Sequence, residues 1–185
     1  MTTYISLLRG INISGHKIIK MDDLKRMFEK LNFRNVSVYL QSGNVIFQHE
    51  GIQENSLKQI ISKQIQADFG FNVPVIVMTN DKLKKIIGSN PYCNDPEKDE
   101  SFFHVTFLDS LPGIYDFQAI AGKKDEKENI FIMDDAVYQY CPNGYGKTKL
   151  NNNFLEAKLK VGATTRNWRT VNELLKIAEK IANEV

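Results

Sequence analysis

Three short polar segments flank apolar stretches of the chain: Arg9-Gly10-Ile11-Asn12, Gln41-Ser42-Gly43-Asn44 and Thr164-Thr165-Arg166-Asn167-Trp168. None of them contains an aspartate, glutamate, histidine or cysteine. Guanidinium groups bind phosphates and carboxylates through paired hydrogen bonds, and amides and hydroxyls can both donate and accept. These segments therefore predict a site for an anionic or polar ligand.

Each residue of the expected site has a role that its chemistry suggests. Cationic side chains would neutralise the ligand, amides would orient its polar groups, and an indole would offer a stacking face. The expected ligand-binding residues are Arg9, Asn12, Ser42, Gly43, Asn44, Lys149, Arg166, Asn167 and Trp168. Purely structural roles are also open, because Ser-Gly-Asn is common turn chemistry, Thr165 or Asn167 could cap a helix, and tryptophan often packs in a core.

A glycine- and lysine-rich loop spans residues 142–149 and ends in Gly146-Lys147-Thr148-Lys149. This resembles the tail of a P-loop, but the first glycine of that motif would fall at Cys141, so the sequence excludes a Walker A site. A weaker expectation remains: Lys147, Lys149 and backbone N–H groups at a helix start could bind an anion.

The charge distribution is uneven although the formal net charge is only +2. Residues 1–122 carry 13 basic and 13 acidic side chains, whereas residues 142–170 carry six basic side chains and one acidic. Residues 9–20 contain Arg9, Lys17 and Lys20 and no acid. We expect a local positive field where such segments lie, which favours an anionic ligand.

The remaining composition excludes several classes of protein. His16, His49 and His104 have no partner at metal-ligand spacing, so the sequence predicts neither a metal site nor a cofactor. Cys93 and Cys141 lack CxxC spacing and indicate reduced thiols. No apolar run reaches the ~20 residues of a membrane helix, and no basic leader is evident. We therefore expect a cytoplasmic protein with no membrane association.

Hydrophobic periodicity in the first part of the chain indicates the order β-α-β-β-α-β, a split βαβ or ferredoxin-like unit. The expected strands are 3–8, 36–40, 45–47 and 73–78, with helices over 21–31 and 57–69. The N-cap of the second helix would be Asn55 or Ser56, and Gly70 would follow its end.

The second part of the chain shows a related pattern, βαββα followed by a terminal helix. We expect a helix over 81–87, a linker over 88–100, strands over 102–108, 130–133 and 136–140, and helices ending near 121 and spanning 149–159. Thr164–Trp168 would open the last helix, and Thr170 with Glu173 fits a capping box. The fold class is α+β with two small lobes, divided into residues 1–80, 81–100 and 101–185.

The strand order also predicts which polar segments lie together. In a split βαβ sheet, the first and third strands are antiparallel neighbours at the centre. The end of one therefore lies beside the start of the other, which places Arg9–Asn12 next to Gln41–Asn44. We expect this pair, with the later basic segments, to form a site between the lobes.

Five segments resemble the signatures of the domain-of-unknown-function family 1697: residues 7–12, 39–45, 90–92, 149–150 and 164–168. The resemblance spans nearly the whole chain and implies a bacterial α+β protein with two dissimilar subdomains. The family carries no established activity, so it supplies no function. Ser14 and the Lys147-Thr148 pair depart from its pattern.

Three functions are compatible with these residues. Binding of a small phosphate-bearing or nucleotide-like ligand fits the polar segments best. Nucleic-acid binding is less favoured, because Gln41–Phe47 lacks the aromatic pattern of RNA-recognition domains. An enzyme acting on a phosphorylated substrate also stays open, since positioning and charge alone can catalyse phosphoryl transfer. The sequence leaves the oligomeric state undecided.

Overall fold

The computed structural model describes residues 1–184, and its contacts divide the chain into two compact units. Unit 1 comprises Met1–Lys85 and Glu173–Val185, and unit 2 comprises Ile86–Asn172. Two helices, α3 (Asn80–Gly88) and α6 (Trp168–Asn183), contain the points where the chain passes from one unit to the other. The expected α+β class with two lobes is confirmed.

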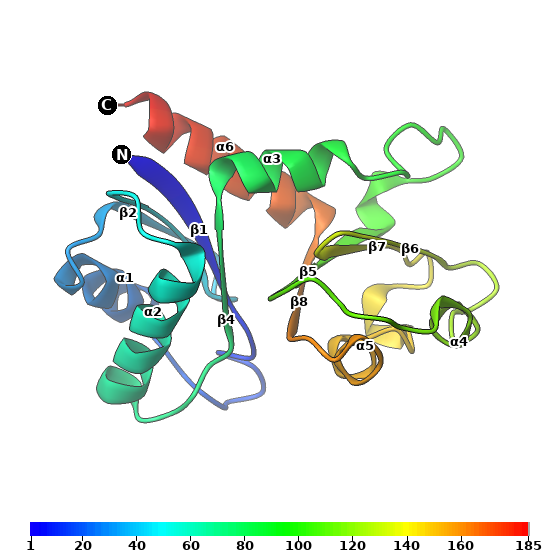
Figure 1. Cartoon of the computed structure of the whole chain (residues 1–185), viewed down its shortest axis with the longest axis horizontal. Helices are drawn as coiled ribbons and strands as arrows, with labels where there is room; N and C mark the ends of the chain where they lie inside the picture. Colours follow the sequence, from blue (N-terminus) through cyan, green and yellow to red (C-terminus); the bar gives the residue numbers. More distant parts are fainter. Residues whose placement is uncertain (185) are drawn as a thin grey trace. The chain divides into compact units, whose positions relative to one another are not determined.

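Unit 1 has the expected β-α-β-β-α-β order (Figure 1). Its elements are β1 (Thr2–Leu8), α1 (Met21–Lys30), β2 (Arg34–Tyr39), β3 (Asn44–His49), α2 (Glu54–Phe69) and β4 (Val75–Thr79). The strands form one antiparallel sheet in the order β2-β3-β1-β4. As predicted, β1 and β3 are neighbours at its centre.

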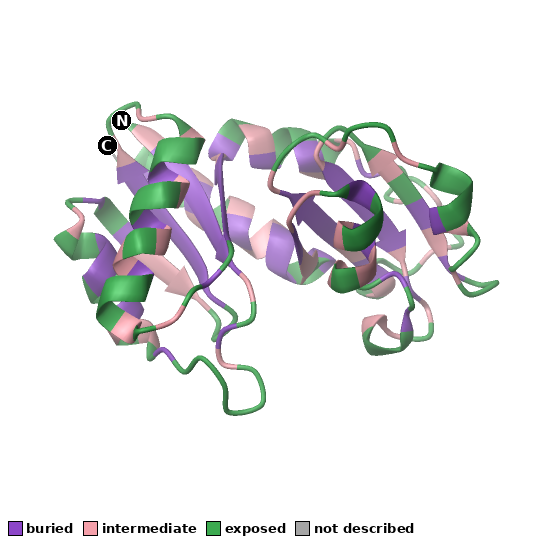
Figure 2. Ribbon diagram, turned by 60° about the horizontal axis from the view of Figure 1, so that its bottom comes forward, coloured by how far each residue is buried: buried purple, intermediate pink, exposed green. Residues whose placement is uncertain are grey.

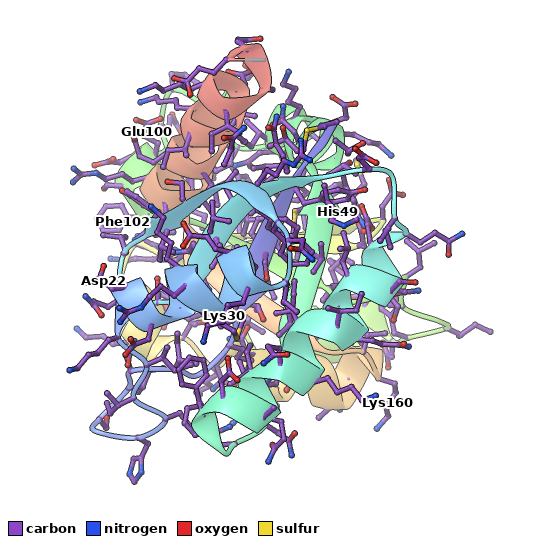
Figure 3. All side chains as sticks on the ribbon, turned by 90° about the vertical axis from the view of Figure 1, so that its left-hand side faces the viewer. Asp22, Lys30, His49, Glu100, Phe102 and Lys160 are labelled. Carbon is purple, nitrogen blue, oxygen red and sulfur yellow. The ribbon has the colours of Figure 1, made fainter. Side chains whose placement is uncertain are left out.

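The core of unit 1 lies between one face of this sheet and helices α1 and α2. Buried strand residues Tyr4, Leu8 and Phe47 pack with Phe28 of α1 and Ile61 of α2. Figure 2 shows the buried strands beside helices whose outer faces are exposed. The charged ends of helix α1 interact favourably with the helix dipole, because Asp22 lies near its start and Lys30 at its end (Figure 3).

Two details of α2 bear on the sequence predictions. The helix begins at Glu54 after Gln53, which makes no side-chain capping bond, so the expected cap at Asn55 or Ser56 is wrong. The end is as predicted: Gly70 adopts the left-handed conformation with φ +79° and terminates the helix.

Unit 2 contains a second four-stranded antiparallel sheet, in the order β6-β7-β5-β8. Its elements are β5 (Phe103–Leu108), α4 (Phe117–Ala121), β6 (Asn129–Met133), β7 (Ala136–Tyr140), α5 (Asn152–Leu159) and β8 (Ala163–Asn167), with 3-10 turns at Glu100–Phe102 and Tyr145–Lys147. Helices α4 and α5 cover one face, where Ile120 and Leu155 pack with Val137.

Strand β8 corrects the sequence prediction for Thr164–Trp168. These residues were expected to open the last helix, but Thr164–Asn167 pair with β5 as an edge strand, Thr165 opposite Thr106. Helix α6 then starts at Trp168, so Thr170 lies inside the helix and the capping box at Thr170 and Glu173 does not form. The cap is Asn167, whose Oδ1 accepts from the Thr170 N–H at 2.8 Å.

Candidate functional site

The two polar segments of unit 1 meet as predicted at one end of the sheet. Leu7 of β1 lies opposite Asn44 of β3, and the Leu8 N–H donates to the Gly43 carbonyl at 2.8 Å. The chain then runs through the loop at residues 9–20, which lies beside the turn at residues 41–44. We call these two segments the loop pair.

Asn12 fastens the loop pair together. Its Nδ2 donates to the carbonyl oxygens of Ile19 at 3.0 Å and Gln41 at 2.9 Å, and its Oδ1 accepts from the Ile19 N–H at 2.8 Å. The side chain thus closes the loop on itself and ties it to the neighbouring turn. All of these partners are backbone groups of the protein, so Asn12 positions the loop.

Gly43 is the point of closest approach between the two segments. A Cβ at this position would lie 2.7 Å from Leu8 Cβ and 2.7 Å from Ile11 Cδ1, and its φ of +73° is left-handed. Glycine is therefore required both by space and by backbone conformation.

Asn44 and Ser42 act inside the turn. Asn44 is fully buried, and its Nδ2 donates to the Tyr39 carbonyl at 2.8 Å and to Ser42 Oγ at 3.0 Å. The structural reading of Ser-Gly-Asn as turn chemistry thus holds for the Asn44 amide, while Ser42 itself is exposed.

The loop at residues 9–20 has an unusual backbone. Gly10, Asn12 and Ser14 have φ values of +73°, +54° and +51°, whereas Ile11 and Ile13 between them are not in the positive-φ region. A backbone that alternates in this way can turn N–H groups toward one side, as in the anion-binding concavities known as nests. Within the loop, the Asn12 N–H donates to the Lys17 carbonyl at 3.2 Å. Residues held in the left-handed region also store strain of a kind that clusters at functional sites.

The electrostatics of this loop are positive. Arg9 is half-buried, Lys17 and Lys20 are exposed, and the loop contains no carboxylate. Lys17 Nζ donates to the Asn72 carbonyl at 2.7 Å, beside a surface hollow of about 630 Å³ on the outer side of α2. The hollow is lined by Ser56, Gln59, Ile60, Ser62, Lys63, Gln66 and Asn72.

The expected site residues of unit 2 are divided between the two faces of their sheet. Arg166 pairs in register with Val105, on the face that also carries Tyr138. Burial lowers the pKa of Arg166 to about 10, and its Nη1 donates to the Thr165 carbonyl at 3.0 Å. Trp168 is 7% exposed and packs edge-on against Phe103, so its ring is a core group.

Lys149 and Asn167 have other surroundings. Lys149 is exposed. The next residue, Leu150, accepts through its carbonyl from the Gln139 side chain, which lies on the face of the unit 2 sheet opposite to that of Arg166. Asn167 is the N-cap of α6. The sequence predicted an anion site at a helix start beside Lys149. At the start of α5, a side chain of the protein already accepts from one of these N–H groups: Asn151 Oδ1 accepts from the Phe154 N–H.

A polar network in unit 2 escaped the sequence analysis. Thr165 Oγ1 accepts from Tyr145 Oη at 2.9 Å, donates to Asn152 Oδ1 at 2.7 Å and lies 2.6 Å from Thr106 Oγ1. Thr106 in turn donates to Gln139 Oε1 at 2.9 Å. The sequence pattern that could have predicted this network is the occurrence of Thr106, Gln139 and Thr165 among apolar residues of neighbouring strands. The hydroxyls satisfy one another and join α5 to the sheet.

Neither a metal cluster nor a membrane helix is found among residues 1–184. No group of three or more histidine, cysteine, aspartate or glutamate side chains in this range is arranged to hold a metal ion. No helix in the same range has the length and apolar character needed to cross a bilayer.

Comparison with known families agrees with the segments noted in the sequence. The family model described as "Protein of unknown function (DUF1697)" matches residues 1–138. The chain belongs to this family. The expected membership of this family is therefore confirmed, and the matched region includes the loop pair. No curated protein matches the sequence.

A solved structure has a similar fold. The conserved bacterial protein SP0830 from Streptococcus pneumoniae superimposes with a TM-score of 0.70 at 20% sequence identity. The match covers 96% of this chain and 98% of that one, so the two proteins share their fold over nearly the whole length of both chains.

Proposed function

We propose that the loop pair of unit 1 binds the phosphate group of a small anionic ligand. The observation that carries this proposal is the clamp made by Asn12, which holds a basic loop without acids against the turn at residues 41–44. A loop whose only role was connection would not need three side-chain hydrogen bonds to keep a strained backbone in place.

The roles within the site follow from the side chains. Backbone N–H groups of the segment from Gly10 to Ser14, apart from that of Asn12, which already donates to the Lys17 carbonyl, donate to phosphate oxygens. The Arg9 guanidinium supplies the opposite charge. Asn12, Gly43 and Asn44 position the two loops. We further infer that binding takes place in the cytoplasm, where the exposed Cys93 and buried Cys141 stay as free thiols.

A thermal-shift titration with inorganic phosphate tests the proposal, with sodium chloride matched for ionic strength. We expect phosphate to raise Tm, because a ligand that binds only the folded state stabilises it. The Arg9→Ala variant should bind about tenfold more weakly and lose most of the shift.

Arg34→Ala provides the matched control. Arg34 is an exposed arginine at the opposite end of β2 from the loop pair, so its loss should leave the phosphate shift unchanged. An equal loss in both variants, or no shift in the wild type, would contradict the proposal. Short oligonucleotides run beside phosphate distinguish nucleic-acid binding, whose affinity falls steeply with salt.

A further inference from the structure

Strand β6 forms an edge of the unit 2 sheet and contains no bulge, proline or charged side chain. Native sheets shield their edges with bulges, prolines or charged side chains. In unit 1 the edge strand β2 has a register shift between Arg34 and Ser37, and Pro74 precedes the edge strand β4. Strand β6, with the sequence Asn-Ile-Phe-Ile-Met, is regular and uncharged.

The register of the hairpin fixes which backbone groups of β6 face outward. Met133 and Ala136 close the two-residue turn Asp134–Asp135, so they exchange both hydrogen bonds of their pair. Because hydrogen-bonded pairs alternate along an antiparallel ladder, Phe131 also bonds to β7. The N–H and C=O groups of Ile130 and Ile132 therefore point away from the sheet. Within residues 1–184 no backbone hydrogen bond outside the hairpin involves either isoleucine.

These outward groups have two-fold symmetry about Phe131. Antiparallel pairing of β6 with an identical strand, centred on Phe131, places Ile130 opposite Ile132 on both sides. Both would then be hydrogen-bonded pairs, and Phe131 would face its copy in a non-hydrogen-bonded pair, where side chains are closest. The strand is thus complementary to itself in both hydrogen bonding and side chains.

The side chains at this edge are partly uncovered. Phe131 is 39% exposed and Met133 is 37% exposed, and their register partners Tyr138 and Ala136 place them on the same face of the sheet. Burying an exposed phenylalanine and an exposed methionine at a sheet edge against another protein surface would lower the free energy, because apolar area would leave water.

We propose that β6 pairs with β6 of a second copy of this chain and joins two four-stranded sheets into one of eight strands. The contact between two such short strands is small compared with the interfaces of stable dimers, so we expect a weak dimer that forms only at higher protein concentration. The proposal does not involve the loop pair, and its test needs no ligand.

Sedimentation velocity over a roughly hundredfold concentration range provides the first test. We expect the wild type to shift from monomer to dimer, and Phe131→Lys and Phe131→Glu each to stay monomeric, because like charges would meet at the two-fold axis. An equimolar mixture of the two variants should dimerise again, since lysine then faces glutamate. That rescue shows that both variants are folded.

Phe117→Lys is the matched control, because Phe117 is 38% exposed, in the same unit, and lies in α4. This variant should dimerise like the wild type. A wild type that stays monomeric throughout, or a dimer that persists in both Phe131 variants, would overturn the proposal.

Amide hydrogen exchange on the wild type tests the same pairing without substitution. Exchange of the Ile130 and Ile132 N–H groups should slow as concentration rises, while the Phe131 N–H, already bonded within the hairpin, should not change. Equal exchange of the two isoleucine amides at low and high concentration would contradict the pairing.

Discussion

The side-chain amide of Asn12 donates to the backbone carbonyl of Gln41 at 2.9 Å, across 29 positions of sequence. This bond links the loop that leaves β1 to the turn that begins β3. The two segments could have been merely adjacent because their strands pair. Instead the half-buried Asn12 side chain ties the loop to the turn, while the buried Asn44 side chain braces the turn from inside through bonds to Tyr39 and Ser42.

Replacing Asn12 should destabilise the protein. Asn12→Ala removes three hydrogen bonds and places an alanine at φ +54°, so we expect a loss of about 2–3 kcal/mol in the free energy of unfolding. Asn12→Gly removes the same bonds but tolerates the backbone, and should recover about 1 kcal/mol of that loss. Urea unfolding measures both, and wild-type stability in both variants would show that the clamp contributes nothing.

A pair of glycine substitutions separates crowding from backbone conformation. Gly43 and Gly10 share φ +73°, but a Cβ on Gly10 would meet nothing within 4 Å. Gly10→Ala should therefore cost about 1 kcal/mol, and Gly43→Ala about 3 kcal/mol or more, because Leu8 and Ile11 would have to move. Equal losses, measured by denaturant unfolding, would mean that the close approach at Gly43 relaxes freely.

The sequence allowed the loop pair to be predicted because strand order carries that information. The apolar strands and the helical stripe of α1 identify a split βαβ unit, and that topology alone places Arg9–Asn12 beside Gln41–Asn44. The role of Asn12 was not predictable, since it depends on where the Ile19 and Gln41 carbonyls point.

Strand β8 was missed for a physical reason. Its sequence, Ala-Thr-Thr-Arg-Asn, has no alternation of apolar and polar residues, because one face packs Ala163 and Thr165 beside α5 while the other carries Arg166. Pairing with β5 supplies the strand, and Asn167 then caps α6. Local propensity could not reveal this, since the decisive partner lies about 60 residues away.

Stability should fall in alkali because of Cys141. Burial, with a smaller effect from the Glu128 carboxylate, raises the pKa of this thiol from 9.0 to about 12. Above the pKa of the unfolded chain, the unfolded state loses the thiol proton while the folded state keeps it, so rising pH favours unfolding.

Between about pH 8 and about pH 10 this effect should cost about 1.4 kcal/mol. Urea unfolding of the wild type and of Cys141→Ala at both pH values isolates it, because any packing defect in the variant is the same at each pH. An identical pH dependence in the two proteins would show that the thiol is not kept protonated by the fold.

The two cysteines should differ in reactivity. Cys93 is exposed, although desolvation and, to a lesser degree, Glu100 raise its pKa, whereas Cys141 is buried. A thiol reagent should therefore label one thiol in the native protein, more slowly than a free cysteine, and both after unfolding. Cys93→Ser should show no native labelling. Rapid labelling of that variant would place Cys141 at the surface.

The central claim is that the loop pair binds phosphate, and the most direct test is an amide NMR titration of the wild type with inorganic phosphate against matched chloride. We predict saturable chemical-shift changes at the backbone amides of residues 10–14, with the Asn12 side-chain amide responding and the β6 amides unchanged. Saturable changes centred elsewhere, or none near residues 10–14 at any phosphate concentration, would contradict this account.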